Sequence, residues 1–356
     1  MLNNLHPGML LRRWTKKLFP AERGRVKTLE DRFAGCLIGQ ALGDALGFLV
    51  EGLPGEYCDA YVRDVVRPRY LPSQRRGSFG FGQYSDDTQL ARELCLSLGA
   101  VHPFEPADYA SRIAALFVEH RIVGRGRATE ESALRLASGV PWHAAGTPPP
   151  SAGNGSAMRA APVGLVYADN PTMMVQVAHQ QSSITHQDPR CSAGSIVIAG
   201  ATALALRDGP LVVDAFCRQL ADWARPFDAP MAALLEELPT WIGESKSVVL
   251  QRVRASNREG KEDWGGISPF VTESVLWSLY AFLASPDDYW EAMCTAIEVG
   301  GDVDTTGAMT GAIAGARSGL AKMPQEFVSA LTDQGTWGYL DLAALGRSLV
   351  DVRRHV

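Results

Sequence analysis

Residues 31–52 read "DRFAGCLIGQALGDALGFLVEG" and decide how the rest of the chain is interpreted. The stretch reads as a helix in which glycine recurs at every fourth position, at Gly35, Gly39, Gly43 and Gly47. Residues four apart lie on the same face of a helix, and a glycine makes a helix less stable than an alanine would. A row of glycines on one face therefore predicts the close approach of another helix or of a ligand.

From residue 29 onward, nearly all of the chain reads as helix. Further helical windows are expected at 86–99, 107–120, 129–138, 192–207, 211–224, 271–284, 288–299 and 306–321. The alternation that marks a strand is scarce, and "YVRDVVR" at 61–67 is its best short candidate. Loops are expected at 68–84, at 146–155 and around 254–268. No repeat or long polar linker divides this body, so the sequence predicts one compact all-α domain.

The composition is that of a well-packed globular protein, with 46% hydrophobic and 21% charged residues among 356. Thirty-four basic residues against 39 acidic ones give a net charge of −5, which does not suggest general nucleic-acid binding. No run of about eighteen apolar residues is present, so no membrane span is expected. The six cysteines are scattered without CxxC spacing, which predicts reduced core residues of a cytoplasmic protein.

Residues 1–28 differ from the rest because lysine and arginine dominate them, with Glu22 as the one acid. Four apolar residues there fall at helical spacing, namely Leu10, Leu11, Trp14 and Leu18. We expect a basic arm at residues 1–28 in front of a folded domain at residues 29–356. The alternatives for the arm are a partly ordered tail, a segment that docks on a partner protein, and an organelle-targeting peptide.

Two short acidic stretches lie more than two hundred residues apart. The first, "YSDDTQLA" at 84–91, sets two aspartates between a serine and a threonine. The second, "GGDVDTTGAMTGAIAGA" at 300–316, places two aspartates and a threonine before an apolar helix of small residues. Either stretch alone fits a helix N-terminus, where a hydroxyl caps the helix and carboxylates favour the positive end of its dipole.

A metal site is the alternative to two separate helix caps. Both stretches bring carboxylates and a hydroxyl to a loop–helix junction with little basic charge beside them. Mg²⁺ and Mn²⁺ prefer about six oxygen ligands. Three oxygens from each stretch would supply one such site, or two ions that share ligands. The donors would be Ser85, Asp86, Asp87, Asp302, Asp304 and Thr305.

A glycine-containing loop offers a candidate phosphate site. In "SAGNGSAMRAAPVGLVY", which starts at residue 151, Gly153, Asn154, Gly155 and Ser156 come directly before a predicted helix. Backbone N–H groups and a hydroxyl would then point outward together, which suits a phosphate. A plain tight turn is the alternative.

Two further loops contain residues that could contact a ligand. His186 lies in the polar stretch "SSITHQDPR", ahead of a long apolar helix, and is either a binding residue or simply hydrogen-bonded in place. The loop "VGRGRAT" at 123–129 contains two glycines, and Arg125 and Arg127 make it positive.

Five motifs in order resemble those of the ADP-ribosylglycohydrolase family: "GQALGDALGFLVEG", "YSDDT", "GNGSAMR", "ITHQDP" and "GGDVDTTGA". They span about residues 30 to 321. The resemblance implies an all-α, orthogonal helical domain with two Mg²⁺ or Mn²⁺ ions at the mouth of an ADP-ribose cleft. It also implies a hydrolase that cleaves the glycosidic bond between ADP-ribose and a serine or arginine side chain, or a small ADP-ribosyl compound.

The resemblance assigns roles to particular residues. It implies metal ligands at Ser85, Asp86, Asp87, Asp302, Asp304 and Thr305, so that a doubly charged ion makes the paired aspartates tolerable. It implies catalytic roles for Glu51, a general base in one branch of the family, and for Asp302. It implies substrate contacts at Gly124, Arg125, Gly126, Gly153, Asn154, Gly155, Ser156, Met158 and His186.

The linkage that is cleaved divides the family into branches. The arginine-cleaving branch usually has an Asp-Ile-Gly stretch in its substrate loop, whereas "VGRGRAT" is closer to the R-G-x-G loop of the serine branch. Some relatives keep the fold as non-catalytic binding or structural proteins, but these tend to lose metal ligands, and all six positions here are oxygen donors. Other relatives serve as immunity proteins against ADP-ribosylating toxins, and the basic arm at residues 1–28 would suit docking on such a toxin.

Overall fold

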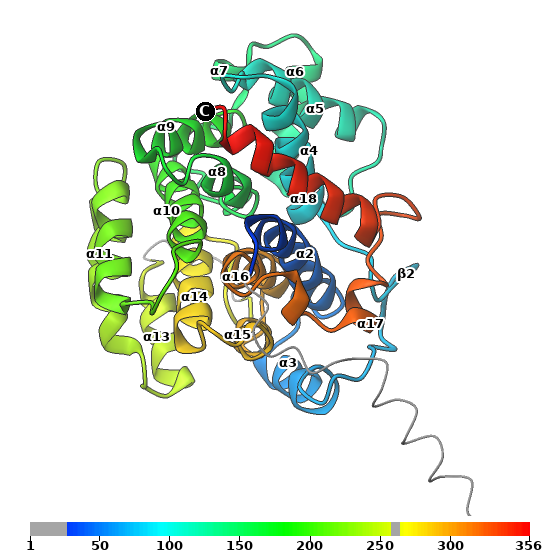
Figure 1. Cartoon of the computed structure of the whole chain (residues 1–356), viewed down its shortest axis with the longest axis vertical. Helices are drawn as coiled ribbons and strands as arrows, with labels where there is room; N and C mark the ends of the chain where they lie inside the picture. Colours follow the sequence, from blue (N-terminus) through cyan, green and yellow to red (C-terminus); the bar gives the residue numbers. More distant parts are fainter. Residues whose placement is uncertain (1–26, 258–263) are drawn as a thin grey trace, which may run out of the picture.

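Two antiparallel helices form the centre of the molecule. The computed structural model describes residues 27–257 and 264–356. Helix α2 (Leu29–Phe48) and helix α16 (Val303–Ser318) lie in the middle of the bundle, and the other helices surround them (Figure 1).

The glycine row of α2 lies against a second glycine row on α16. A Cβ atom on Gly39 would lie 2.3 Å from the carbonyl oxygen of Gly311, and one on Gly43 would lie 2.1 Å from that of Gly307. No carbon atom fits at these distances, so the two backbones are in direct contact. The row predicted either a helix or a ligand at this face, and the structure places a helix there.

The chain is almost entirely helical. The first helices are α2, α3 (Gly55–Tyr61), α4 (Asp86–Ala100), α5 (Pro106–Val118), α6 (Arg127–Ala137), α7 (Trp142–Ala145), α8 (Ala161–Val166) and α9 (Pro171–Ser183). The later ones are α10 (Pro189–Ala205), α11 (Val213–Ala224), α12 (Ala229–Glu237), α13 (Lys246–Ala255), α14 (Val271–Ala284), α15 (Tyr289–Ile297), α16, α17 (Gln325–Val328) and α18 (Tyr339–Arg353). Short helical turns are η2 (Val62–Val66), η3 (Leu238–Trp241) and η4 (Leu320–Lys322). Within the described residues the only sheet is the antiparallel pair β1 (Arg75–Arg76) and β2 (Phe79–Gly80).

The prediction of an all-α fold is confirmed, and each of the eight further windows contains a helix. Several helices were not predicted, among them α9, α12, α13 and α18, and α8 begins later than the helix expected directly after Ser156. Proline stands in the first turn of α8, α9 and α12. Its missing N–H is harmless there because the first N–H groups of a helix have no partner within it. A residue that often ends a helix therefore begins these three.

The strand candidate at 61–67 is wrong. Helix α3 continues there into η2, a π-helical turn. Val62 and Val66 are four residues apart and both buried, while Arg63 and Asp64 between them are exposed. β-Branched residues favour strands only weakly, and packing against the core overrides the preference.

Other expectations can be compared directly with the structure. All six cysteines are buried and free, as predicted. Across the described parts of the chain, no helix has the length and apolar character needed to cross a membrane. The helical pattern expected within the basic arm falls on residues 1–26, which lie outside the described residues.

Gly43→Ala is expected to lower the free energy of unfolding by about 3 kcal/mol, because the added methyl group overlaps the Gly307 backbone. Urea denaturation followed by circular dichroism measures the change. Gly99→Ala is the matched control, since Gly99 lies in α4 and nothing lies within 4 Å of its Cβ position. That control should be neutral or stabilising by up to about 1 kcal/mol. Equal losses in the two variants would contradict the backbone contact.

Candidate functional site

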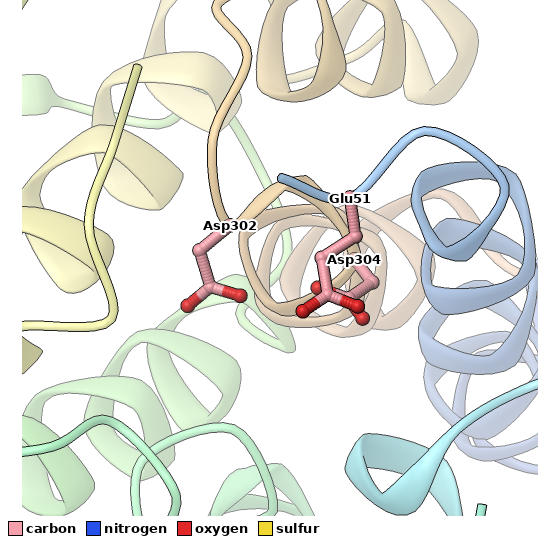
Figure 2. Close-up of side chains that lie close together, drawn as sticks. All are labelled: Glu51, Asp302 and Asp304. Carbon is pink, nitrogen blue, oxygen red and sulfur yellow. The ribbon is translucent and has the colours of Figure 1, made fainter. Parts of the chain in front are cut away.

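The two acidic stretches meet where α2 ends and α16 begins. A Cβ atom on Gly47 would lie 2.3 Å from the carbonyl oxygen of Val303, so the last turn of α2 touches the first turn of α16. Figure 2 shows the carboxylates of Glu51, Asp302 and Asp304 pointing toward the same region. One ligand oxygen from each lies within 4.8 Å of those of the other two.

The other acidic stretch comes from the first turn of α4. Ser85 caps this helix, as its hydroxyl accepts a hydrogen bond from the Asp87 backbone N–H at 3.3 Å. The same hydroxyl donates to Asp87 Oδ2 at 3.1 Å, and Thr305 Oγ1 donates to that oxygen from α16 at 3.4 Å. Ser85 therefore caps α4, as the helix-cap alternative predicted, and its hydroxyl also contacts the carboxylate of Asp87.

The cluster has the properties of a cation site. Burial, together with the charges of Asp44 and Glu51, raises the pKa of Asp86 to about 7. Burial and the charge of Glu51 likewise raise the pKa of Asp302 to about 6. Asp87 Oδ1 is buried and has no hydrogen-bond partner among the described residues. A divalent cation would supply the missing partner and stabilise the ionised carboxylates, so this all-oxygen donor set fits one.

Asp44 is a buried carboxylate that sequence reasoning missed. It follows Gly43 in α2 and is fully buried. Its oxygens accept hydrogen bonds from Ser85 N at 2.8 Å, from Thr88 N at 3.1 Å and from Thr88 Oγ1 at 2.6 Å. Asp44 therefore holds the turn that carries Asp86 and Asp87. The sequence signal that could have indicated Asp44 is its position as an aspartate between two glycines of a mostly apolar helix.

Arg76 is a second residue that the sequence did not indicate. Its guanidinium forms an ion pair with Glu51, donates to the carbonyl oxygen of Phe48 at 3.0 Å, and lies 4.8 Å from the centre of the Phe48 ring. The short hairpin of β1 and β2 thus brings a cation to the rim of the acidic cluster. The region was predicted only as a loop, and a single arginine within it gave no signal.

The glycine loop at 153–156 is tied to the acidic cluster through Asn154. The side-chain amide of Asn154 donates to Asp302 Oδ2 at 2.5 Å and to Ser274 Oγ at 2.9 Å. The prediction that the loop leads straight into a helix is wrong, because turns continue until α8 begins at Ala161. The N–H groups of Gly155 and Ser156 nevertheless have no hydrogen-bond acceptor among the described residues.

Two side chains near this loop point into the protein. The Ser156 hydroxyl was expected to face outward, but it is fully buried, donates to the Cys191 carbonyl oxygen at 3.3 Å and accepts from Ser182 Oγ at 3.0 Å. Met158 is also buried, and Gln40 Nε2 donates to its carbonyl oxygen at 3.0 Å. The Ser156 hydroxyl thus connects the glycine loop to α9 and α10 through these two hydrogen bonds.

His186 and the loop at 124–126 lie beside these elements. A Cβ atom on Gly155 would lie 3.4 Å from His186 Nε2, so the imidazole packs on the glycine loop. Gly124 has a φ of +79°, and a Cβ there would lie 2.6 Å from Asp86 Oδ1. Arg125 pairs with Glu130 at 3.0 Å. The structure thus brings every predicted site segment to one region.

Comparison with known proteins identifies the family. A family model described as ADP-ribosylglycohydrolase matches residues 25–355. The chain belongs to the ADP-ribosylglycohydrolase family. This membership confirms the resemblance and the prediction of an enzyme of this class.

Relatives of this ADP-ribosylglycohydrolase include named hydrolases of ADP-ribosyl bonds. The chain is similar to ADP-ribosylhydrolase ARH3 of Homo sapiens, with 29% identity over 89% of this chain and 92% of the relative. It is 28% identical to ADP-ribosylarginine hydrolase Tri1 of Pseudomonas putida, over 84% of this chain and 73% of the relative. A solved structure titled "ADP-ribosylglycohydrolase-related protein complex" matches with a TM-score of 0.66 and 27% identity, and covers 92% of this chain and 100% of that chain.

The stability of the metal-free protein is expected to fall as the pH rises from about 4 through 7. Unfolded aspartates titrate near about 3.9, whereas Asp86 in the folded chain titrates at about 7, so the folded state holds the extra protons in this range. Mg²⁺ should oppose the fall by stabilising the ionised carboxylates. Differential scanning calorimetry in EDTA and in Mg²⁺ measures both effects. A Mg²⁺-induced rise in Tm that is larger at about pH 5 than at about pH 8 would contradict the expectation.

Asp44→Asn is expected to weaken Mg²⁺ binding roughly ten- to a hundred-fold, because an amide NH₂ cannot accept the hydrogen bonds that hold the first turn of α4. Isothermal titration calorimetry with Mg²⁺ measures the affinity. Asp59→Asn is the control, as Asp59 is exposed on α3 and pairs with Arg63. Unchanged Mg²⁺ affinity in Asp44→Asn would show that Asp44 does not position the turn.

Proposed function

We propose that this ADP-ribosylglycohydrolase is a metal-dependent hydrolase that removes ADP-ribose from a serine or arginine side chain. The observation that carries the proposal is the convergence of two acidic turns with Glu51 at the junction of α2 and α16. Glycosidic cleavage of ADP-ribose develops positive charge on the ribose ring, as glycoside hydrolysis does in general. A group of carboxylates is suited to that charge.

We propose that the metal is Mg²⁺, or Mn²⁺, bound as two ions. The residues that would hold it are Ser85, Asp86, Asp87, Asp302, Asp304 and Thr305. When bound, the cations supply Lewis-acid polarisation and orient the ribose hydroxyls. The unpartnered Asp87 Oδ1 and the raised pKa values of Asp86 and Asp302 support this assignment.

Glu51 is the proposed general base. Its carboxylate belongs to the same group as those of Asp302 and Asp304, and it is half-buried. An oxygen of Glu51 can take a proton from the attacking water or return one to the departing side chain. Arg76 holds that carboxylate from the side and limits the directions in which it can turn. Asp302, which accepts from Asn154, links the reacting ribose to the glycine loop.

The rest of ADP-ribose is proposed to extend along the loops. The backbone N–H groups of Gly155 and Ser156 and the imidazole of His186 are suited to the diphosphate. Gly124 and Gly126 lie against Asp86, where a side chain larger than hydrogen on Gly124 would collide with the carboxylate. The likeness of "VGRGRAT" to the serine branch favours a serine linkage, while the similarity to Tri1 keeps arginine as the second candidate.

The substrate is tested by incubating the protein with serine- and arginine-ADP-ribosylated peptides in Mg²⁺ and in EDTA. Release of ADP-ribose from one peptide, lost in EDTA and restored by Mg²⁺, is the expected result. Cleavage that continues in EDTA would contradict metal dependence. Binding of ADP-ribose without release from either peptide would contradict hydrolysis of both linkages.

Glu51→Gln is expected to lower kcat at least about a hundred-fold while the Kd for ADP-ribose changes less than about two-fold, since glutamine keeps the shape and loses the base. Steady-state kinetics and calorimetry measure the two quantities. Glu56→Gln, on the exposed first turn of α3, should alter neither. Near-normal turnover in Glu51→Gln would remove Glu51 from the mechanism.

Some expectations remain predictions. They are the division into an arm at residues 1–28 and a catalytic domain at 29–356, a cytoplasmic location, and a toxin partner for the arm. Most of the arm lies outside residues 27–257 and 264–356, which the structure describes.

A further inference from the structure

A buried arginine lies behind the glycine loop, and the proposed function does not use it. Arg159 is fully buried, and its guanidinium packs 5.5 Å from the centre of the Tyr109 ring. Its Nε donates to Gln181 Oε1 and its Nη2 to Gln181 O, both at 2.9 Å. Nη1 has no hydrogen-bond partner among the described residues. The charge of Asp86 acts on Arg159 without a hydrogen bond between the two, so the guanidinium is held in place by neutral partners.

Arg159 also contacts the residue next to His186. Its Nη2 donates to Thr185 Oγ1 at 2.8 Å, and Thr185 Oγ1 lies 2.8 Å from His186 Nδ1. Thr185 is fully buried, and its hydroxyl has no other partner among the described residues. Two hydrogen bonds therefore meet at one hydroxyl oxygen, and the direction of the first constrains the second.

The direction follows from what each group can donate. A guanidinium can only donate, so Thr185 Oγ1 accepts from Arg159. The single hydroxyl hydrogen of Thr185 is then free, and His186 Nδ1 is its one acceptor. If Nδ1 carried a proton instead, that hydroxyl hydrogen would be buried without an acceptor, which costs about 1–3 kcal/mol.

We propose that Arg159 and Thr185 are positioning residues that fix His186 as the neutral imidazole protonated on Nε2, so that it presents an N–H to an anionic oxygen. The inference rests on the proposed function for its ligand, the diphosphate of ADP-ribose. His186 donates to that ligand because Arg159 and Thr185 keep the proton of the ring on Nε2.

The surroundings of His186 Nε2 fit this role. Nε2 makes no hydrogen bond to a described residue and is not sealed from solvent. The nitrogen faces the glycine loop, 3.4 Å from the Cβ position of Gly155 and 3.6 Å from that of Gly153. The N–H groups of Gly155 and Ser156 lie in the same loop without acceptors.

The charge state of His186 agrees with the tautomer. Burial lowers the pKa of His186 to about 3, and the charge of Arg159 contributes to the lowering. A neutral ring offers one donor and one acceptor, so the partner of Nδ1 decides which nitrogen faces the ligand. A lone pair on Nε2 would repel a phosphate oxygen, whereas an N–H attracts it.

The tautomer is measured directly by long-range ¹H–¹⁵N spectra of the ¹⁵N-labelled full chain, with the His186 signals assigned by their loss in His186→Gln. The expected pattern is a protonated Nε2 and an unprotonated Nδ1. A protonated Nδ1 would overturn the proposal. This readout needs no turnover, so it stands apart from any failure of the hydrolase assignment.

Binding variants test the consequence for the ligand. Glutamine places an amide NH₂ near the position of Nε2, and asparagine places one near Nδ1. His186→Gln is therefore expected to bind ADP-ribose within about three-fold of the unmodified protein, and His186→Asn about ten- to a hundred-fold more weakly. Equal losses in both variants would overturn the donor role of Nε2.

The chain of hydrogen bonds from Arg159 through Thr185 to His186 is tested by substitution of Thr185. Thr185→Val removes the hydroxyl and is expected to weaken ADP-ribose binding at least about five-fold and to yield mixed tautomers, while Thr185→Ser restores both readouts. Thr202→Val is the matched control, because Thr202 is equally buried and its hydroxyl bonds only within α10. Unchanged affinity and an unchanged tautomer in folded Thr185→Val would overturn the proposal. Should Thr185→Val not fold, the spectrum of the unmodified chain still decides it.

Discussion

The contact between the backbones of α2 and α16 is the constraint on which the rest of the structure depends. Glycine at matched positions of both helices lets their carbonyl oxygens lie where any larger residue would place a side chain. The contact continues to the last turn of α2, where Gly47 meets Val303. Glu51 and the aspartates that begin α16 are consequently held beside each other by main chain rather than by flexible side chains.

That arrangement brings several negatively charged carboxylates close together at the site. Burial and the charges of neighbouring carboxylates raise the pKa values of Asp87 and Asp304, and the ion pair with Arg76 engages Glu51. Buried carboxylates remain ionised only with a counter-ion, and without one they take up protons. The same oxygens whose pKa values are raised are the proposed ligands of a hard cation.

Asn154 joins the acidic half of the site to a half made of donors. On one side of it lies Asp302, and on the other lie the unpartnered N–H groups of the glycine loop and the imidazole of His186. A ligand that carries hydroxyls at one end and phosphates at the other matches this order. Behind the acidic half, Asp44 accepts hydrogen bonds from the first turn of α4. Behind the other half, Arg159 donates to Thr185, the residue before His186. The donors and acceptors of the site are therefore oriented before a ligand arrives.

The sequence by itself determined the all-α class, the meeting of the glycine row with a close neighbour, and the segments of the site, because helical periodicity, glycine and carboxylate patterns are local properties. Only the tertiary structure decided the π-helical turn at Val62–Val66, the inward hydroxyl of Ser156, and the roles of Asp44, Arg76 and Arg159. Each of these depends on which atoms of distant segments come within hydrogen-bond distance. An aspartate or arginine in a sequence does not reveal its partner, because the partner is chosen by packing.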